Sequence, residues 1–478
     1  DAGGRLVERR LNSGLRTTQT WFEDGNLKQK QNLFNTTVLS SYLYTLDNQG
    51  RRSGQTEDIN GVSKVWSYAY DNLDRLISAS DGAAETYAYD IFGNRRSKTK
   101  SGQTTAYLYD AAQQLAEIRS GSDTGTLIGG AVHDADGHMV KLCEGTSATK
   151  TATDCTASGT GATTLALVWN ALDHLVTATR TGSGAIAESY VYDDSGRRIS
   201  KTSGGTTTSY LYDGDAIHAE WAGSINGMPQ AAYVHGAGID EPLLRLTGTT
   251  NMPGAAQIAY LQDGLGSVTA AVGALQEAQN LAPLTGTGLG TTGDYYTSAY
   301  PPEALRDGAT TINSAGWIGK TDANAAFTYS FGTPQAVDRI ALMAVNNYRP
   351  AAWVVEVQAP GTGTWTQVAS GTQNDFSPWT DNSSVWAEKR FTPTLVQAVR
   401  VRFTAAVTSN LVWLTEAEVY SVPVADTLQG FDAWGNRTTG TGTIPTYGYT
   451  GREPDATGLT YYRARYYHPG LGRFASRD

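Results

Sequence analysis

A short motif recurs along this chain and limits its fold more than any other feature. The strings YDNLDRL, YDIFGNR and YDDSGRR begin at Tyr70, Tyr89 and Tyr192. Looser copies begin at Trp21, Tyr44, Tyr109, Val132, Trp169 and Tyr212. Neighbouring copies lie about 19–24 residues apart, with one longer gap before Asn170. A fixed period of this kind indicates one supersecondary unit repeated many times.

Each copy has the pattern of a strand, a tight turn and a return strand. Apolar and polar residues alternate before the acid, as in Tyr87-Ala88-Tyr89, which is typical of a strand. The Asp can accept backbone N–H bonds and so open a turn, and a Gly three positions later can adopt a positive φ. About ten such hairpins in sequence predict one long antiparallel sheet, which must curl or close because open sheets rarely exceed about ten strands.

Composition agrees with a chain of many short strands. The sequence contains 53 Gly, 26 Tyr and 11 Trp, and only 17% of its residues are charged. This mix disfavours coiled coils, helical bundles and disorder. The net charge of −10 disfavours a nucleic-acid partner, and the apolar runs are too short for a membrane span. We therefore expect neither nucleic-acid binding nor a membrane span.

These repeats resemble the RHS/YD-repeat family, which includes bacterial polymorphic toxins, shell subunits of insecticidal toxin complexes and teneurins. The resemblance covers residues 1–282 and 424–478. It implies an all-β fold in which a spiralling strip of β-hairpins forms a hollow shell or tube. The segment YGYTGREPDATGLTYYRARYYHPGLGRFASRD from Tyr447 resembles the RHS-associated core that ends such shells.

In this family the shell can cut itself after the core with two Asp carboxylates and a supporting Arg. The resemblance assigns the first Asp to Asp478 and the Arg to Arg477, and places the remaining residues beyond the chain. Both ends of the sequence lie inside motifs, so we expect it to be part of a longer protein. Alone it would not be an enzyme, and Asp478 could equally be a terminal strand residue.

Residues 283–423 interrupt the repeat with short alternating segments that predict a β-sandwich of jelly-roll type. The order of its motifs resembles a discoidin domain, also called coagulation-factor type C or family-32 carbohydrate-binding module. The resemblance implies a structural Ca²⁺ held by Asp307 and Glu416, since hard oxygen ligands suit this ion. The residues after Gly308 depart from the family pattern, and both acids could instead be solvated.

The same resemblance implies sugar binding by loops at one end of the sandwich. Aromatic rings stack on sugar C–H groups, while Asn and Arg supply directed hydrogen bonds. A Trp in a sandwich is more often a core residue. The candidates on two loops are Asn346, Asn347, Tyr348, Arg349, Trp379 and Trp386.

The two cysteines, Cys143 and Cys155, lie in a Thr/Ser/Gly-rich excursion that lengthens one repeat. Free thiols are one possibility. A disulfide is the other, and we favour it because neither neighbourhood is apolar; it would indicate an oxidising, secreted setting. Common catalytic motifs are missing from the sequence, which has no HExxH, no GxSxG and no GxGxxG after a strand.

Together these observations predict a structural shell segment that encapsulates or presents a C-terminal, toxin-like polypeptide and carries an outward carbohydrate-binding module. Two alternatives stay open: an extracellular adhesion protein, and a surface filament or tube that self-assembles through unpaired edge strands. All three interpretations place the protein outside the cell or on its surface. The expected partners are glycans or cell-surface polysaccharide and the encapsulated or downstream polypeptide.

Overall fold

The computed structural model describes residues 1–11, 15–34, 37–247, 256–273, 280–284, 286–294, 300–308, 316–376, 384–421, 427–441 and 445–477. The chain forms two compact units: unit 1 is Asp1–Leu275 with Ala425–Asp478, and unit 2 is Gln276–Val424. The first boundary lies before the predicted one at residue 283. Leu281 and Ala282, which we assigned to the repeats, are buried in the core of unit 2.

Within the described residues, unit 1 is built on one sheet of 25 strands. Each strand pairs antiparallel with the next one of the sheet, so the sheet is a continuous meander in which β13 pairs β16 and β25 pairs β33. Its first thirteen strands are β1 (Glu8–Arg10), β2 (Leu15–Trp21), β3 (Leu27–Phe34), β4 (Thr37–Leu46), β5 (Arg52–Ile59), β6 (Val62–Tyr70), β7 (Leu76–Ser80), β8 (Ala84–Tyr89), β9 (Arg95–Lys100), β10 (Gln103–Tyr109), β11 (Leu115–Ser120), β12 (Leu127–His133) and β13 (Met139–Glu144). The others are β16 (Thr163–Trp169), β17 (Leu175–Gly182), β18 (Ile186–Tyr192), β19 (Arg198–Ser203), β20 (Thr206–Asp213), β21 (Ala216–Ala222), β22 (Ala231–His235), β23 (Pro242–Thr247), β24 (Ala256–Gln262), β25 (Val268–Gly273), β33 (Thr427–Phe431) and β34 (Arg437–Thr441).

The recurring motif forms the hairpin turns along one rim of this sheet, which we call the turn ladder. In the turn 71–75, the Oδ1 atom of Asp71 accepts from the backbone N–H groups of Leu73 and Arg75, at 2.9 and 3.0 Å. The residue three positions after the acid has positive φ whether or not it is glycine, as at Gly93 and Asp74. The acid and the left-handed residue thus both belong to the turn, as the sequence predicts.

The aromatic residue of each motif joins its hairpin to the preceding one. The Tyr89 hydroxyl donates to the carbonyl of Leu76, at 2.6 Å, and Tyr70, Tyr109, Tyr192 and Tyr212 make the same bond to the first residue of the preceding return strand. The guanidinium of Arg75 lies over the Tyr89 ring, 4.8 Å from its centroid. The motif therefore stabilises contacts between repeats as well as the turn itself.

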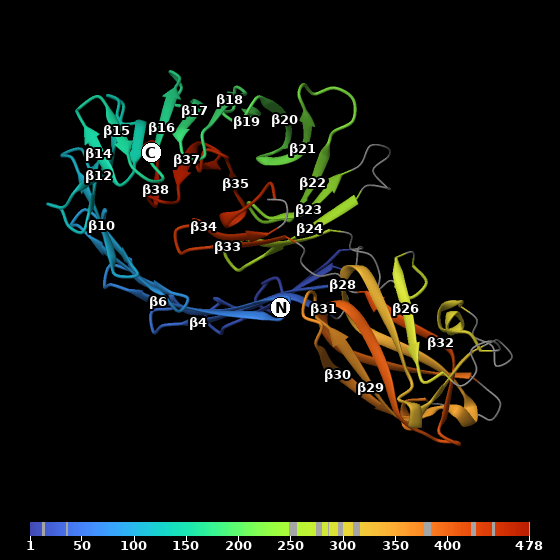
Figure 1. Ribbon diagram of the computed structural model, residues 1–478. Helices are drawn as coiled ribbons and strands as arrows, with labels where there is room; N and C mark the ends of the chain where they lie inside the picture. The colour runs from blue at the N-terminus through green and yellow to red at the C-terminus, as the bar shows by residue number, and fades with distance from the viewer. Residues whose placement is uncertain are drawn as a thin grey trace. The chain divides into compact units, whose positions relative to one another are not determined.

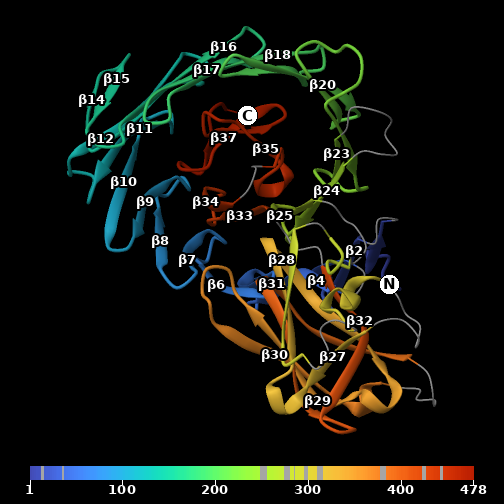
Figure 2. The ribbon, with the colours of Figure 1, turned by 45° about the vertical axis from the view of Figure 1, so that its right-hand side comes forward.

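The sheet curls until its two ends pack face to face. Apolar residues of β2–β5 and of β23–β25 form one buried cluster. Lys30 Nζ donates to the Asp263 carbonyl at 3.0 Å, Asn32 donates to the Gln262 carbonyl at 3.2 Å, and Arg9 pairs with Glu241. Figure 2 shows unit 1 as a curved wall around the C-terminal strands. The predicted all-β strip of hairpins is confirmed.

Two small sheets complete unit 1. The hairpin β14 (Ser147–Lys150) and β15 (Cys155–Ser158) lies in the excursion after β13. The C-terminal residues 445–477 form η6 (Tyr449–Gly451) and a sheet of β35 (Glu453–Pro454), β36 (Thr460–Tyr462), β37 (Arg465–His468) and β38 (Arg473–Phe474). We call residues 445–477 the C-terminal segment; its strands lie inside the curve of the wall (Figure 1).

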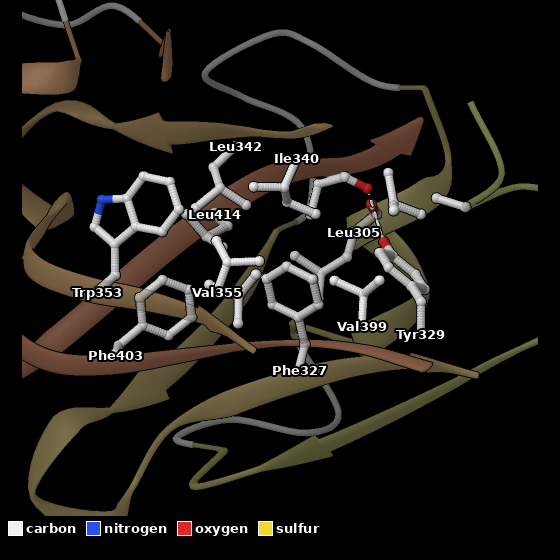
Figure 3. Packing of buried hydrophobic residues seen from close by; sticks show 14 of the residues in the cluster. Leu305, Phe327, Tyr329, Ile340, Leu342, Trp353, Val355, Val399, Phe403 and Leu414 are labelled. Atoms are coloured by element: carbon white, nitrogen blue, oxygen red, sulfur yellow. Dashed lines mark hydrogen bonds between the residues drawn. The ribbon is translucent and has the colours of Figure 1, made fainter. Parts of the chain in front are cut away.

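Unit 2 is a β-sandwich. The bent strands β28 and β31 pair along two stretches, and each runs through both layers. One layer contains β26, β29 and β30, and the other contains β27 and β32. The elements are β26 (Thr287–Thr292), η2 (Pro302–Arg306), β27 (Trp317–Lys320), η3 (Thr321–Ala323), β28 (Ala326–Val345), η4 (Asn346–Tyr348), β29 (Pro350–Gln358), β30 (Trp365–Thr372), η5 (Gln373–Asp375), β31 (Ser384–Ala406) and β32 (Leu411–Ser421). Figure 3 shows the core between the layers, where Phe327, Leu342 and Trp353 are buried.

Candidate functional site

The concave face of the wall holds the C-terminal segment through a buried apolar interface. Leu459, Tyr461, Tyr466, Leu471 and Ala475 pack in one cluster with residues of β10–β13 and β16–β18. Buried and exposed residues alternate along these strands, as in β16 and β18, and the wall residues of the cluster come from the buried, inward-facing positions. The alternation that predicts strands in the sequence therefore supplies the docking surface.

At the centre of this interface lies a buried ionic cluster. Arg198 is 0% exposed. Its Nη1 and Nη2 atoms donate to Asp455 Oδ2 at 2.7 Å and to Glu453 Oε2 at 2.9 Å. Lys201 Nζ donates to Asp455 Oδ1 at 3.0 Å, and the Tyr461 ring lies 4.2 Å from the guanidinium carbon of Arg198. A charge removed from water is tolerated when it is paired and hydrogen-bonded, as this arginine is.

Electrostatics separates the two carboxylates of this cluster. Burial raises the pKa of Glu453 above its ordinary value, and Asp455 raises it further despite the opposing effect of Arg198. Burial also opposes ionisation of Asp455, but Arg198 and Lys201 outweigh it and hold its pKa below the ordinary value. Asp455 is therefore the carboxylate that neutralises Arg198.

Beside this cluster lies a cavity of about 670 Å³, between the wall, β33–β34 and the C-terminal segment. Charged side chains of both signs line it, including Arg180, Lys201, Glu188 and Glu220. The cavity is far smaller than a folded protein domain. The chain's own C-terminal segment packs against the concave side of β10–β13, β16–β18, β20–β22, β24 and β25.

Of the two self-cleavage residues suggested by resemblance, Arg477 lies where the C-terminal segment reaches the turn ladder. Arg477 is exposed, and its Nη2 atom donates to the Ala112 carbonyl at 3.4 Å. Its side chain lies over Gly137, where a Cβ atom would come within 2.6 Å of Nε. Asp478 lies outside the described residues, so its role stays a prediction.

Cys143 and Cys155 form a disulfide in the structure, with their Cα atoms 6.0 Å apart. Both are buried in a small cluster with Val132, beneath the β14–β15 hairpin. The bond joins this hairpin to β13 of the wall. Our expectation that neither neighbourhood is apolar was wrong, because hairpin residues fold over the sulfur atoms.

The two predicted metal ligands lie together in unit 2. Glu416 is 2% exposed, and its Oε2 atom accepts from the Gly308 N–H at 2.8 Å. Burial, with the nearby charges of Asp307 and Glu418, raises the pKa of Glu416 to about 8. Among the described residues, no Lys or Arg forms an ion pair with Glu416. A buried carboxylate beside a second acid and without a basic partner fits the ligand set of a hard cation such as Ca²⁺.

The described sugar-binding candidates lie at and near the end of β28. Asn347 is exposed, and Tyr348 and Arg349 are half-buried, at the turn between β28 and β29. Trp386 is half-buried in β31, opposite Met343 of β28. Trp379 and the side chain of Asn346 lie outside the described residues.

Sequence reasoning missed two aromatic residues beside Tyr348. The ring of Trp413 lies 6.0 Å from that of Tyr348 and 5.4 Å from that of Tyr300. Three partly exposed rings from three separate segments thus form one group, which we call the aromatic cluster. No local signal in the sequence joins them, because strand pairing at the start of β32 brings them together.

The described residues contain no helix with the length and apolar character needed to cross a membrane.

The sequence of the repeats matches a known family model and parts of known proteins. The teneurin YD-shell family model matches residues 14–219. The tRNA3(Ser)-specific nuclease WapA of Bacillus spizizenii is 27% identical over 173 residues, which are 35% of this chain and 6% of that protein. Toxin subunit YenC1 of Yersinia entomophaga is 62% identical over 32 residues, which are 7% of this chain and 3% of that protein. The chain thus matches only a small part of each relative's length, and these matches support a YD-shell.

Solved structures similar to this chain include carbohydrate-binding modules. The family 32 module of NanJ from Clostridium perfringens, in complex with galactose, is 19% identical and covers 30% of this chain and 98% of its own, with a TM-score of 0.24. Chitosan-binding module 1 of a chitosanase/glucanase from Paenibacillus sp. IK-5 is 20% identical and covers 30% of this chain and 99% of its own, with a TM-score of 0.24.

Proposed function

We propose that unit 1 is a structural wall that holds the C-terminal segment on its concave face and so presents the polypeptide that follows it. The observation that carries the proposal is the fully buried Arg198, which joins the wall to Asp455 and Glu453 of that segment. Because the cavity beside this segment is about 670 Å³, an enclosure for a folded domain would need further chain. Toxin-like cargo and a location outside the cell belong to this proposal, and the buried disulfide supports the location.

Limited proteolysis of the whole chain tests this function. We expect residues 445–477 to resist cleavage in the wild type and to be released early in Arg198→Met, which leaves two buried carboxylates without their guanidinium. Arg197→Met is the matched control, because the adjacent Arg197 pairs with Asp193 in a partly exposed turn. Equal resistance of the two variants would contradict the proposed docking, and early cleavage of the wild-type segment would contradict it directly.

We further propose that unit 2 binds glycans through the aromatic cluster of Tyr300, Tyr348 and Trp413. Partly exposed rings supply stacking faces, and the neighbouring Asn347 and Arg349 supply polar groups of the kind that bind sugar hydroxyls. A glycan array with the whole chain should show binding that Trp413→Ala and Tyr348→Ala abolish. Trp365→Ala is the control. Trp365 belongs to β30 and pairs with Gln358, the last residue of β29, whereas Tyr348 precedes the first residue of β29.

Unit 2 is also proposed to hold Ca²⁺ with Asp307 and Glu416. When bound, the ion would supply the positive charge that these carboxylates lack and would stabilise their loop. We expect calcium to raise the melting temperature of the unit 2 transition in the wild type and not in Glu416→Gln. An unchanged melting temperature in the wild type would exclude this site.

A further inference from the structure

Two turns of the turn ladder have different side chains at the same position: Arg51 in the turn 47–51 and His138 in the turn 134–138. In the turn 47–51, one guanidinium satisfies three side-chain acceptors drawn from two successive turns, and the carbonyl of Asp71 as well. Arg51 donates through Nε to Asp47 Oδ2 at 2.7 Å, through Nη2 to Gln49 Oε1 at 2.9 Å, and through Nη1 to Asp74 Oδ1 at 2.7 Å. Asp74 belongs to the following turn and has positive φ. A cation thus lies between three oxygen atoms at this step.

In the turn 134–138, the three acceptor positions are all carboxylates and the arginine is replaced by His138. The equivalents of Asp47, Gln49 and Asp74 are Asp134, Asp136 and Asp173, and Asp173 has the same positive φ as Asp74. His138 Nδ1 lies 3.2 Å from Asp134 Oδ2, and Nε2 lies 3.4 Å from Asp173 Oδ1. The site therefore gains negative charge and loses the permanent cation.

His138 is buried and fixed in orientation, as metal-binding histidines usually are. The His138 side chain is 8% exposed, and its ring stacks on Trp169 with centroids 4.8 Å apart. Ligand atoms of Asp134, Asp136 and His138 lie within 4.8 Å of one another. Asp136 and His138 border an open cavity of about 780 Å³ that gives an ion a route from solvent. Burial of an imidazole among carboxylates leaves the cluster with the donors, the geometry and the access that a metal needs.

We propose that Asp134, Asp136 and His138 bind a divalent first-row transition ion, for which Zn²⁺ is the probe. One imidazole nitrogen with carboxylate oxygens is a ligand set that zinc accepts. The bound ion would supply at the turn 134–138 the positive charge that the Arg51 guanidinium supplies at the turn 47–51. This site is separate from the proposed Ca²⁺ ligands of unit 2.

The next turn provides a matched control. His174 occupies the position of His138, but its surrounding acceptors are replaced by Asn170, Leu172 and, in the following turn, Gly196. His174 stacks on Tyr192 with centroids 4.6 Å apart, much as His138 stacks on Trp169. The two histidines therefore share a stacked position and differ in the carboxylates around them and in burial, since His138 is buried and His174 is half-buried.

Zinc binding is measured by calorimetry on the whole, untagged, chelator-treated chain, in buffer with excess Ca²⁺ to saturate unit 2. We expect one Zn²⁺ per chain and a higher melting temperature of unit 1. His138→Ala should weaken binding by at least about tenfold, since even residues that only support a ligand contribute that much. His174→Ala should bind as the wild type does. Cobalt in place of zinc should give a visible absorption band that depends on His138.

His138→Arg guards against a variant that merely misfolds. It restores the guanidinium found at Arg51, so we expect a folded chain with wild-type or higher melting temperature and no zinc binding. Asp136→Asn should lose affinity while keeping the turn. Three results would overturn the proposal: no stoichiometric binding by the wild type, wild-type affinity in His138→Ala or His138→Arg, or equal losses in His138→Ala and His174→Ala, which would indicate an adventitious ion only.

Discussion

The two units of this protein are stabilised in different ways. Unit 2 has one continuous apolar core, in which Phe327, Leu342 and Trp353 lie between two layers. Unit 1 divides its apolar residues among five smaller clusters within its described residues, and links its repeats by hydrogen bonds and stacked arginines. In a repeating structure most contacts are with the neighbouring repeat, so each substitution acts locally. A single core makes a substitution felt by the whole domain.

We expect the largest loss of stability at the ionic cluster of Arg198 and Asp455, which joins distant parts of unit 1 rather than neighbouring repeats. Asp455→Asn keeps the shape of the side chain and removes the charge that neutralises Arg198 and Lys201. Breaking a buried ion pair from one side costs about 3–5 kcal/mol, and we expect a loss of that size in the unfolding free energy of unit 1. Chemical denaturation with separate probes for the two units measures it.

Asp47→Asn is the control for this variant, because Asp47 lies in a partly exposed turn and Asn170 already fills the same position in another turn. Its loss should be much smaller than that of Asp455→Asn, because solvent screens an ion pair in such a turn. If both variants lost equal stability, the contrast between the docking cluster and the turn ladder would fail.

In unit 2, Leu342→Ala should lower the unfolding free energy by about 2–5 kcal/mol, since it opens a cavity in the single core. Differential scanning calorimetry should show the unit 2 transition moving to lower temperature while that of unit 1 stays in place. A shift of both transitions would mean that the units unfold together and would remove the basis of the comparison.

A smaller, pH-dependent effect is expected at Lys30 in unit 1. Burial lowers its pKa to about 8, below the usual value near 10.5. Between these values the unfolded chain binds more protons than the folded chain, so stability rises with pH. We expect a gain of about 1–2 kcal/mol between about pH 8 and about pH 9.5.

Denaturation curves for Lys30→Met should lack this rise, while Lys28→Met, with its exposed side chain, should retain it. The difference between the two variants isolates Lys30 from other titrating groups. A rise of equal size in both would show that another group is responsible.

The smallest effect concerns one link between repeats. Tyr89→Phe removes the hydroxyl that donates to Leu76 and leaves the ring under Arg75 in place, so the loss should be about 1 kcal/mol. Tyr68→Phe is the control, because Tyr68 lies in β6 two residues before the motif tyrosine Tyr70 and so farther from the turn. Hydrogen exchange should show faster opening of β7 and β8 only, and exchange that quickens throughout unit 1 would contradict local stabilisation.

The sequence predicts the repeats well because each one is encoded locally. Alternation gives the strand, Asp71 and residues like it give the turn, and the aromatic residue before the acid marks the link to the preceding repeat. The sequence could not predict that β2–β5 pack against β23–β25, nor that Arg198 meets Asp455, because these contacts join residues far apart in the chain. The aromatic cluster in unit 2 was missed for the same reason.

The order of strands has a consequence for how the protein is made. Since every strand of the meander pairs with its immediate predecessor in the sheet, the wall can be extended hairpin by hairpin as the chain is synthesised, at low cost in loop closure. The C-terminal segment leaves the ribosome after the wall and meets a surface that already exists. Its docking then follows formation of the wall, and Arg198 of the wall binds Asp455 and Glu453 only at this step.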